Sequence, residues 1–490
     1  MFLMRANNKS ISSNFIWRLL ERFGAQGVTL IVSIVLARMI DPEAYGSIAI
    51  VTVFTSFCAI FIDGGFSSAL IQKKDADEFD FSSVFYFNLV LCFLLYLILF
   101  IFAPFISDFY SMPTLKWVLR IQALTLIISG LKGIQITYVT KTMQFKKFFW
   151  STLGGTIAAA VIGVWMAYRG YGIWALVVQG LVNNTIDTVL LWITVKWRPR
   201  LFFSFKRIKY LFSYGWKLLI SSIVYSSYSD IRQLIIGKAY SSNDLAYYNK
   251  AYQFPQIMFE NTSNALNSVL FPAMAEKQDD KEDIKRVVKR TNTLSSYVVS
   301  PIMLGMAVVA EPFISILLGE KWLFAVPYMQ VFCLMYAFSA GVASANQNAL
   351  KAIGKSDLLL VIEVIKCAVD LAILFITMRF GVFAIAVGMA AGTVARTFIC
   401  AFPAKKYYNY PFLEQLKDIF PNLILNMVMG FCTYMMVYMP LDKYAIFVLQ
   451  VFAGISLYLL LSVLTKNKDF EYVLGKIHNF FRTKKGKLTK

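Results

Sequence analysis

Apolar runs of about 20 residues recur along the whole 490-residue chain, with short polar breaks between them. A helix of about 20 residues spans the roughly 30 Å hydrocarbon core of a bilayer, whereas a β-barrel would show alternating segments of about 10 residues. Only 16% of the residues are charged, against roughly a quarter in soluble proteins. The sequence therefore predicts an all-α polytopic membrane protein with about 14 transmembrane helices. The expected spans are 12–37, 45–71, 82–107, 115–140, 148–168, 172–195, 211–237, 245–273, 291–318, 325–350, 358–378, 382–402, 419–439 and 444–465.

Lysine and arginine are distributed unevenly between the two sides of these spans. The side that holds both termini receives most of them, including the clusters at 196–209 and 277–290. Loops on the cytoplasmic side of membrane proteins carry such an excess, so both termini are predicted to be cytoplasmic. The formal net charge of +20 is thus a topology signal, and no nucleic-acid partner is expected. The opposite loops hold only Arg38, Lys116, Arg169, Lys238, Lys321, Arg379 and Lys443.

An internal repeat divides the chain into two halves. Six spans in each half place both halves in the membrane in the same sense, related by an axis along the membrane normal. The predicted organisation is an N-terminal six-helix lobe (1–200), a C-terminal six-helix lobe (201–410), two additional helices (411–465) and a basic tail (466–490). The offset drifts from about 196 to 209 along the chain. The matching pairs are Trp17-Arg-Leu-Leu20 with Trp216-Lys-Leu-Leu219, Ser68-Ala-Leu70 with Asn264-Ala-Leu266, Ala103-Pro-Phe-Ile-Ser107 with Glu311-Pro-Phe-Ile-Ser315, and Tyr171-Gly-Ile-Trp-Ala-Leu176 with Phe380-Gly-Val-Phe-Ala-Ile385.

Polar and cationic residues follow one face of the first helix of each half. Residues three and four apart share a helix face, and ionisable groups within a span normally face a bundle interior or an aqueous cavity. Long cationic side chains near the membrane surface can instead extend to the interface, and this reading stays open for Arg18, Arg22 and Lys217. The predicted cavity residues are Arg18, Arg22, Gln26, Lys217, Tyr228 and Arg232, joined on the next span by Lys250, Gln256 and Asn264.

Two carboxylates fall at nearly corresponding places of the two halves, Asp63 and Glu260. One hypothesis is that they carry a coupling proton or sodium ion. The alternative is that each neutralises a cavity cation or marks a helix break. Gly64 and Gly65 follow Asp63 and weaken the helix there. They allow either a bend or close packing, and the sequence does not choose between them.

Other charged residues within the spans are expected to satisfy one another. Glu363, Lys366 and Asp370 share a helix face, which favours a structural network over substrate contact. Arg120, Lys132, Asp187 and Arg396 are expected to pair across helices in the same way.

Motifs of catalysis are missing from the sequence. The single histidine, His478, lies in the tail, so no Ser-His-Asp or Cys-His set can be built within the spans. No Walker motif is present, and the six cysteines show no metal-binding spacing. We therefore expect neither an enzyme, nor a metal site, nor a bound cofactor. A proton or sodium gradient remains as the energy source.

Three stretches carry a family resemblance: Leu36–Gly46 (LARMIDPEAYG), Asp63–Gln72 (DGGFSSALIQ) and Tyr171–Val177 (YGIWALV). The sequence resembles the bacterial polysaccharide flippases of the multidrug/oligosaccharidyl-lipid/polysaccharide exporter superfamily, most strongly over residues 12–400. It is most similar to the branch that moves O-antigen or exopolysaccharide repeat units.

The resemblance implies a flippase in the bacterial inner membrane that moves undecaprenyl-diphosphate-linked oligosaccharide by alternating access. Membrane lipids, a polysaccharide polymerase and a chain-length regulator are its implied partners. The cationic residues would then meet the diphosphate through charge-assisted hydrogen bonds. Two alternatives remain: a cation-coupled exporter of small molecules on the same fold, and a membrane enzyme of glycan assembly, which the short outer loops disfavour.

Overall fold

Helices joined by short turns make up the protein. The computed structural model describes residues 8–63, 65–276 and 280–476, which form helices and no strands. The chain divides into two compact units, Met1–Ala246 and Tyr247–Lys490. The helix α9 belongs to the first unit because it packs against α2, α3 and α4. The unit boundary thus falls beyond residue 200, where the sequence repeat places the end of the first lobe.

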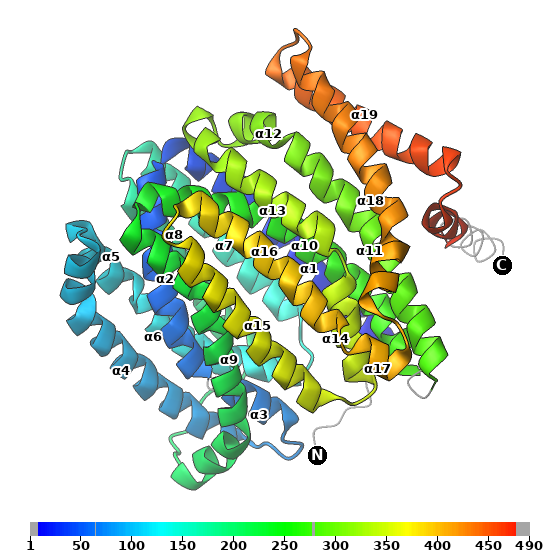
Figure 1. The fold of residues 1–490 in the computed structure, drawn as a ribbon. Coiled ribbons are helices and arrows are strands. Elements are labelled where there is room, and N and C mark those ends of the chain that lie inside the picture. The colour runs from blue at the N-terminus through cyan, green and yellow to red at the C-terminus, as the bar shows by residue number, and fades with distance from the viewer. Residues whose placement is uncertain (1–7, 64, 277–279, 477–490) are drawn as a thin grey trace, which may run out of the picture. The chain divides into compact units, whose positions relative to one another are not determined.

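The first unit is built around α7, which packs against both α1 and α8 (Figure 1). Val32 and Leu36 of α1 bury their side chains there with Ile40, which follows α1, and with Ala167 and Ala175. Its helices are α1 (Asn8–Met39), α2 (Pro42–Asp63), α3 (Phe66–Gln72), α4 (Glu78–Tyr110), α5 (Pro113–Gln122), α6 (Leu124–Lys141), α7 (Lys146–Tyr168), α8 (Ile173–Thr194), α9 (Phe205–Ala239) and the first residues of α10 (Ser242–Glu276).

In the second unit, α11 packs against both α13 and α18, and α15 packs against α16. The two helices that follow the predicted lobes, α18 and α19, contact each other. The helices are the rest of α10, α11 (Lys281–Val308), α12 (Ala310–Leu317), η1 (Glu320–Ala325), α13 (Val326–Ser339), α14 (Val342–Ala352), α15 (Ser356–Thr377), α16 (Val382–Ala401), α17 (Ala404–Tyr408), α18 (Phe412–Met435), η2 (Met436–Tyr438) and α19 (Lys443–Leu464).

Many of these helical stretches suit a membrane. Within the described residues, nine are long and apolar enough to cross one, and the pair α11 and α12, bent by 69°, makes ten. The protein is therefore a multi-pass membrane protein. The helices α9 and α10 are 35 residues each but are more polar, and they account for part of the difference from the predicted 14 spans. The count of 14 stays a prediction.

Gly65 lies at the break between α2 and α3. Gly65 adopts a left-handed conformation with φ 73° and precedes α3. It also approaches α9 so closely that a Cβ atom at Gly65 would lie 2.4 Å from the carbonyl oxygen of Gly215. The sequence left a bend and close packing as alternatives. The structure shows close packing at Gly65, at the break between α2 and α3.

Basic segments from three loops meet at one end of the first unit. The buried carboxylate of Asp80 accepts hydrogen bonds from Lys73 at 2.7 Å and from Arg207 at 2.8 Å. Lys141 donates to the carbonyl oxygen of Lys73. Burial opposes ionisation of Asp77, but hydrogen bonds from the Asp80 amide and from Arg207 outweigh it, so the pKa of Asp77 lies below its usual value. These contacts join the start of α9 to the loop between α3 and α4.

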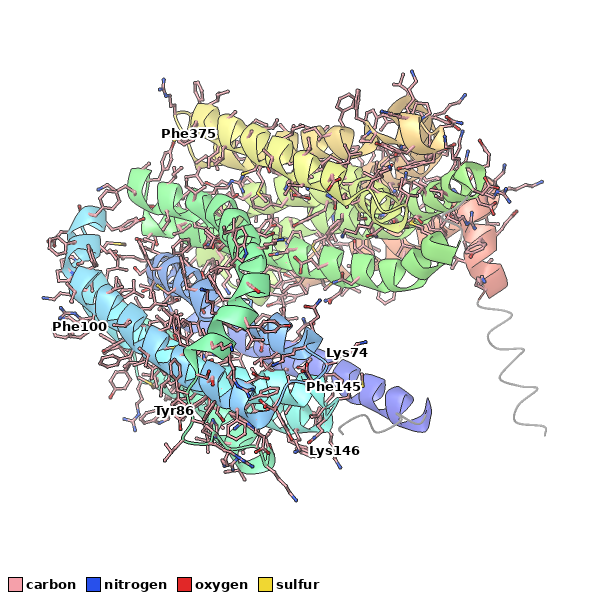
Figure 2. All side chains as sticks on the ribbon, turned by 90° about the horizontal axis from the view of Figure 1, so that it is seen from below. Lys74, Tyr86, Phe100, Phe145, Lys146 and Phe375 are labelled. Atoms are coloured by element: carbon pink, nitrogen blue, oxygen red, sulfur yellow. The ribbon has the colours of Figure 1, made fainter. Side chains whose placement is uncertain are left out.

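A second view shows how the ends of the first unit differ. Lys74, Phe145 and Lys146 gather toward one end of this unit, whereas Phe100 of α4 lies toward the other (Figure 2). The loops at 72–80 and 141–147 and the segment at 196–209 were all predicted to lie on one side of the membrane. Their contacts through Lys141 and Arg207 agree with that arrangement.

The second unit has a similar charged end. Lys285 and Lys289 of α11 pair with Glu414 and Asp418 of α18 at 3.0 Å and 2.7 Å. Farther along α11, Arg290 pairs at 3.0 Å with the buried carboxylate of Asp469, which lies just after α19. The two additional helices are thus fixed to α11 at this end. Residues 477–490 of the predicted basic tail lie outside the described residues.

Replacing Gly65 with alanine should destabilise the protein. An L-residue in the left-handed region costs about 1–2 kcal/mol, and the new Cβ would collide with the backbone of Gly215. The melting temperature of the purified protein in detergent should therefore fall. Gly133→Ala is the matched control, because no atom lies within 4 Å of its Cβ position. An equal melting temperature for the two variants would contradict the close contact.

Asp80→Asn should also lower the melting temperature, by removing the carboxylate that Lys73 and Arg207 share. Loss of one partner from a buried pair costs about 3 kcal/mol. Glu78→Gln breaks an ion pair with Arg200 in which both side chains are more than half exposed, and such pairs contribute less than about 1 kcal/mol. A loss for Glu78→Gln as large as that for Asp80→Asn would contradict the role given to Asp80.

Candidate functional site

The polar face of α10 is the most continuous set of predicted site residues that the structure describes. Lys250 is buried, with 7% of its surface exposed, and its Nζ donates to Oε1 of Gln253 at 3.3 Å. Farther along, Gln256 is half-buried and donates to Oε1 of Glu260 at 2.8 Å. Glu260 and Asn264 are exposed. This face therefore passes from a buried cation to an exposed carboxylate within α10.

Aromatic side chains of α10 and α13 lie beside this face. The hydroxyl of Tyr336 donates to the hydroxyl of Tyr252 at 3.0 Å, and the rings of Phe259 and Tyr336 stack with 4.4 Å between their centroids. Tyr336 also lies within electrostatic range of Glu260 and Arg396. The second unit thus brings one carboxylate, one guanidinium and two tyrosine hydroxyls into a single region. The sequence did not predict a role for Tyr336, because its hydroxyl partner, Tyr252, lies on another helix.

In the first unit, the polar stripe of α1 and α9 is turned away from the bundle core. Gln26 and Lys217 are exposed, and Arg232 is half-buried. The Nε of Arg232 is buried and has no hydrogen-bond partner among the described residues. These positions agree with a polar face that has no role in the packing of the unit itself. The side chains of Arg18, Arg22, Asp63 and Tyr228 lie outside the described part of the structure.

The predicted pairing of charges across helices is confirmed for Lys132 of α6, whose Nζ lies 3.0 Å from Oδ2 of Asp187 on α8. It is wrong for Arg120, which stacks on the ring of Phe100 and donates to the carbonyl oxygen of that residue. An aromatic ring and a carbonyl oxygen can together stabilise an arginine side chain. Such partners carry no formal charge, so a search of the sequence for opposite charges does not find them.

The predicted network on α15 is confirmed in part. Lys366 pairs with Glu363 at 2.8 Å, but Asp370 pairs with Arg396 of α16. Helical spacing identified the shared face without revealing that a neighbouring helix supplies the partner of Asp370. In the described ranges, no group of three or more His, Cys, Asp or Glu side chains could hold a metal ion.

Solved structures with the same fold are membrane flippases and exporters. The lipid II flippase MurJ in an inward closed conformation has a TM-score of 0.75, with 16% identity over 92% of this chain and 99% of the flippase. An inward-facing multidrug resistance transporter of the MATE family has a TM-score of 0.59, with 12% identity over 84% of this chain and 99% of the transporter. At these identities the likeness establishes the fold. The protein therefore has the fold of a flippase or exporter of this superfamily.

Sequence comparison gives the family. The family described as polysaccharide biosynthesis protein matches residues 35–327, which is more than half of the chain. The protein belongs to this family.

Named relatives come from several bacteria. The succinoglycan biosynthesis transport protein ExoT of Rhizobium meliloti is 26% identical over 67% of this chain and 66% of its own length. The teichuronic acid biosynthesis protein TuaB of Bacillus subtilis is 28% identical over 62% and 63%. The lipopolysaccharide biosynthesis protein WzxC of Escherichia coli is 23% identical over 63% of each chain. The match thus spans a little under two thirds of the length of these curated relatives.

Proposed function

We propose that this protein is a flippase that moves an undecaprenyl-diphosphate-linked oligosaccharide from the inner to the outer leaflet of the bacterial cytoplasmic membrane. The family, the fold it shares with a lipid II flippase, and relatives named for succinoglycan, teichuronic acid and lipopolysaccharide synthesis all support this proposal. Transport proceeds by alternating access, and the saccharide serves the synthesis of a surface polysaccharide. A polysaccharide polymerase and a chain-length regulator act on it afterwards.

The observation that carries the proposal is the set of cations on α9 and α10. Lys217 is exposed, Arg232 is half-buried and Lys250 is buried, all on helices of a chain that is 58% hydrophobic. A charge within the hydrocarbon layer is costly unless it meets a partner or an aqueous cavity. A diphosphate supplies anionic oxygens, to which arginine can donate two parallel hydrogen bonds.

The charged ends of the two units support the proposed orientation in the membrane. Basic segments meet at one end of each unit, around Asp80 in the first and around Asp469 in the second. Cytoplasmic loops carry the excess of lysine and arginine, so we assign these ends and both termini to the cytoplasm.

Arg232→Ala and Lys217→Ala should each reduce flipping by about tenfold or more while leaving membrane insertion intact. A hydrogen bond to a charged group contributes about 1.5–3 kcal/mol, and about 1.4 kcal/mol is a factor of ten. The measurement is the transfer of a lipid-linked oligosaccharide between the leaflets of proteoliposomes that contain the purified protein. Lys116→Ala is the control, because Lys116 is an exposed cation of α5 that stacks on Trp117 and is not one of the predicted cavity residues. Unchanged flipping in both variants would contradict the cationic cavity.

A second assay separates the flippase from an exporter of small molecules. Proteoliposomes are loaded with a fluorescent organic cation in place of the lipid-linked saccharide. We expect no export of the dye. Gradient-driven export of the dye, together with no saccharide flipping, would favour the exporter.

For energy coupling, Glu260→Gln and Asp63→Asn should blunt the response of flipping to an imposed proton or sodium gradient. Glu260 is exposed and accepts a hydrogen bond from the neutral side chain of Gln256, so its carboxylate is accessible to an ion. Asn264→Ala, one helical turn farther along α10, is the control for an exposed polar residue of the same face. If flipping by a variant depends on the gradient as strongly as flipping by the wild type, the substituted residue has no role in coupling.

A further inference from the structure

One member of each of two ion pairs inside the helical bundles lies at an equivalent position of the internal repeat. The offset of 209 residues that relates the starts of α8 and α16 also carries Asp187 onto Arg396 and Asn184 onto Thr393. The same place in the two halves thus holds an acid in one and a base in the other. Both are paired, with Lys132 and Asp370 respectively.

Local hydrogen bonds show that the two places are equivalent in structure as well as in sequence. In α8, the hydroxyl of Thr188 donates to the carbonyl oxygen of Asn184 at 2.7 Å. In α16, the hydroxyl of Thr397 donates to the carbonyl oxygen of Thr393 at 2.9 Å. The offset of 209 therefore relates matching turns of the two helices.

In the first unit, a lysine ammonium joins a carboxylate and a neutral oxygen. The Nζ of Lys132 lies 3.0 Å from Oδ2 of Asp187 and 2.9 Å from Oδ1 of Asn184. The side chains of Lys132 and Asp187 are only 17% and 15% exposed. The second carboxylate oxygen of Asp187 is buried without a hydrogen-bond partner among the described residues. An ammonium ion thus fills a site whose ligands are oxygen atoms.

In the second unit, a guanidinium has the same two kinds of partner. The Nε of Arg396 lies 3.5 Å from Oδ2 of Asp370, and its Nη2 donates to the hydroxyl of Thr393. Asp370 is 4% exposed at its side chain. Gly392 leaves room for the carboxylate, because a Cβ atom there would lie 2.5 Å from Oδ1 of Asp370. In the second unit, the cation Arg396 is on α16 and the carboxylate Asp370 is on the neighbouring helix α15. The neutral oxygen comes from Thr393, at the position equivalent to Asn184.

Removing Lys132 or Arg396 would take away the basic partner that lies beside a buried carboxylate and a neutral oxygen. A buried carboxylate is unstable without a positive partner, and oxygen ligands of this kind suit small hard cations. We propose that Lys132 and Arg396 are tethered cations. Each fills a carboxylate–oxygen site that would otherwise bind a sodium ion, and so excludes sodium from the bundle of its unit.

This inference concerns ion selectivity and does not depend on the proposed cargo. It removes Asp187 and Asp370 from the carboxylates available for coupling. Asp63 and Glu260, which lie outside both pairs in sequence, are unaffected by it.

The test is sodium binding by variants that lack one tethered cation. Lys132→Met and Arg396→Met remove the charge and leave the carboxylate and the neutral oxygen in place. The melting temperature of the full-length protein in detergent is measured in sodium chloride and in choline chloride at equal ionic strength. A ligand that binds only the folded state raises stability, so each variant should melt about 2–4 °C higher in sodium. The wild type should show no sodium-dependent rise that depends on Asp187 or Asp370.

Controls separate this effect from a general loss of charge. The double variants Lys132→Met/Asp187→Asn and Arg396→Met/Asp370→Asn lack the carboxylate and should show no sodium response. Arg120→Met in the first unit and Lys366→Met in the second should show none either. Arg120 contacts no carboxylate, and the partner of Lys366, Glu363, is 55% exposed at its side chain.

Three results would overturn the proposal. The first is a sodium-dependent rise for the wild type that Asp187→Asn or Asp370→Asn abolishes, because the carboxylate would then already bind the ion. The second is no sodium response in either single variant. The third is that neither single variant can be recovered folded in sodium chloride. If the carboxylate and the neutral oxygen could bind sodium, the ion would stabilise the folded variant. Recovery of a variant in sodium but not in choline supports the proposal.

Discussion

An ionised side chain within a bilayer needs an opposite charge or water, and this requirement orders much of the structure. Asp187 and Asp370 lie among packed helices, and each has a basic side chain within 3.5 Å. Asp80 and Asp469 are buried at the charged ends of their units, and each likewise contacts an arginine. Removing one partner of a buried pair is strongly destabilising, because it leaves a buried charge with less compensation. The helices must therefore pack so that each of these buried carboxylates meets a basic side chain.

Close backbone contacts act together with these pairs. Gly65 meets Gly215, and a Cβ atom at Gly46 would lie 1.8 Å from the carbonyl oxygen of Ser242. Glycines near both ends of the segment that runs from α2 into α3 therefore let α9 and the start of α10 approach it. This contact explains why α9 is part of the first unit although its sequence repeats that of α1. The break between α2 and α3 therefore serves close packing.

The sequence predicted the helical membrane fold, the gathering of basic loops and the family, because hydropathy and charge distribution reflect local physical constraints. It predicted that Lys132 and Asp187 each pair across helices, because a buried charge needs a partner, but it did not assign them to each other. It did not predict that Asp370 pairs outside its own helix, or that Arg120 stacks on Phe100, because the choice of partner depends on how neighbouring helices are placed. The predicted face of α10 was recognisable because its residues follow helical spacing. The increase in solvent exposure along this face, from buried Lys250 to exposed Glu260, depends on tertiary packing.

The opposite signs of Asp187 and Arg396 also limit how the two halves can have diverged from a common ancestral segment. A single substitution that reversed one sign would place two like charges side by side, with a penalty larger than most proteins tolerate. The intermediate sequences must therefore have carried an uncharged residue at this turn in one half, or acquired a new partner first. The partners do come from different helices, α6 in one unit and α15 in the other. At least one of the two charge pairs therefore arose after the duplication.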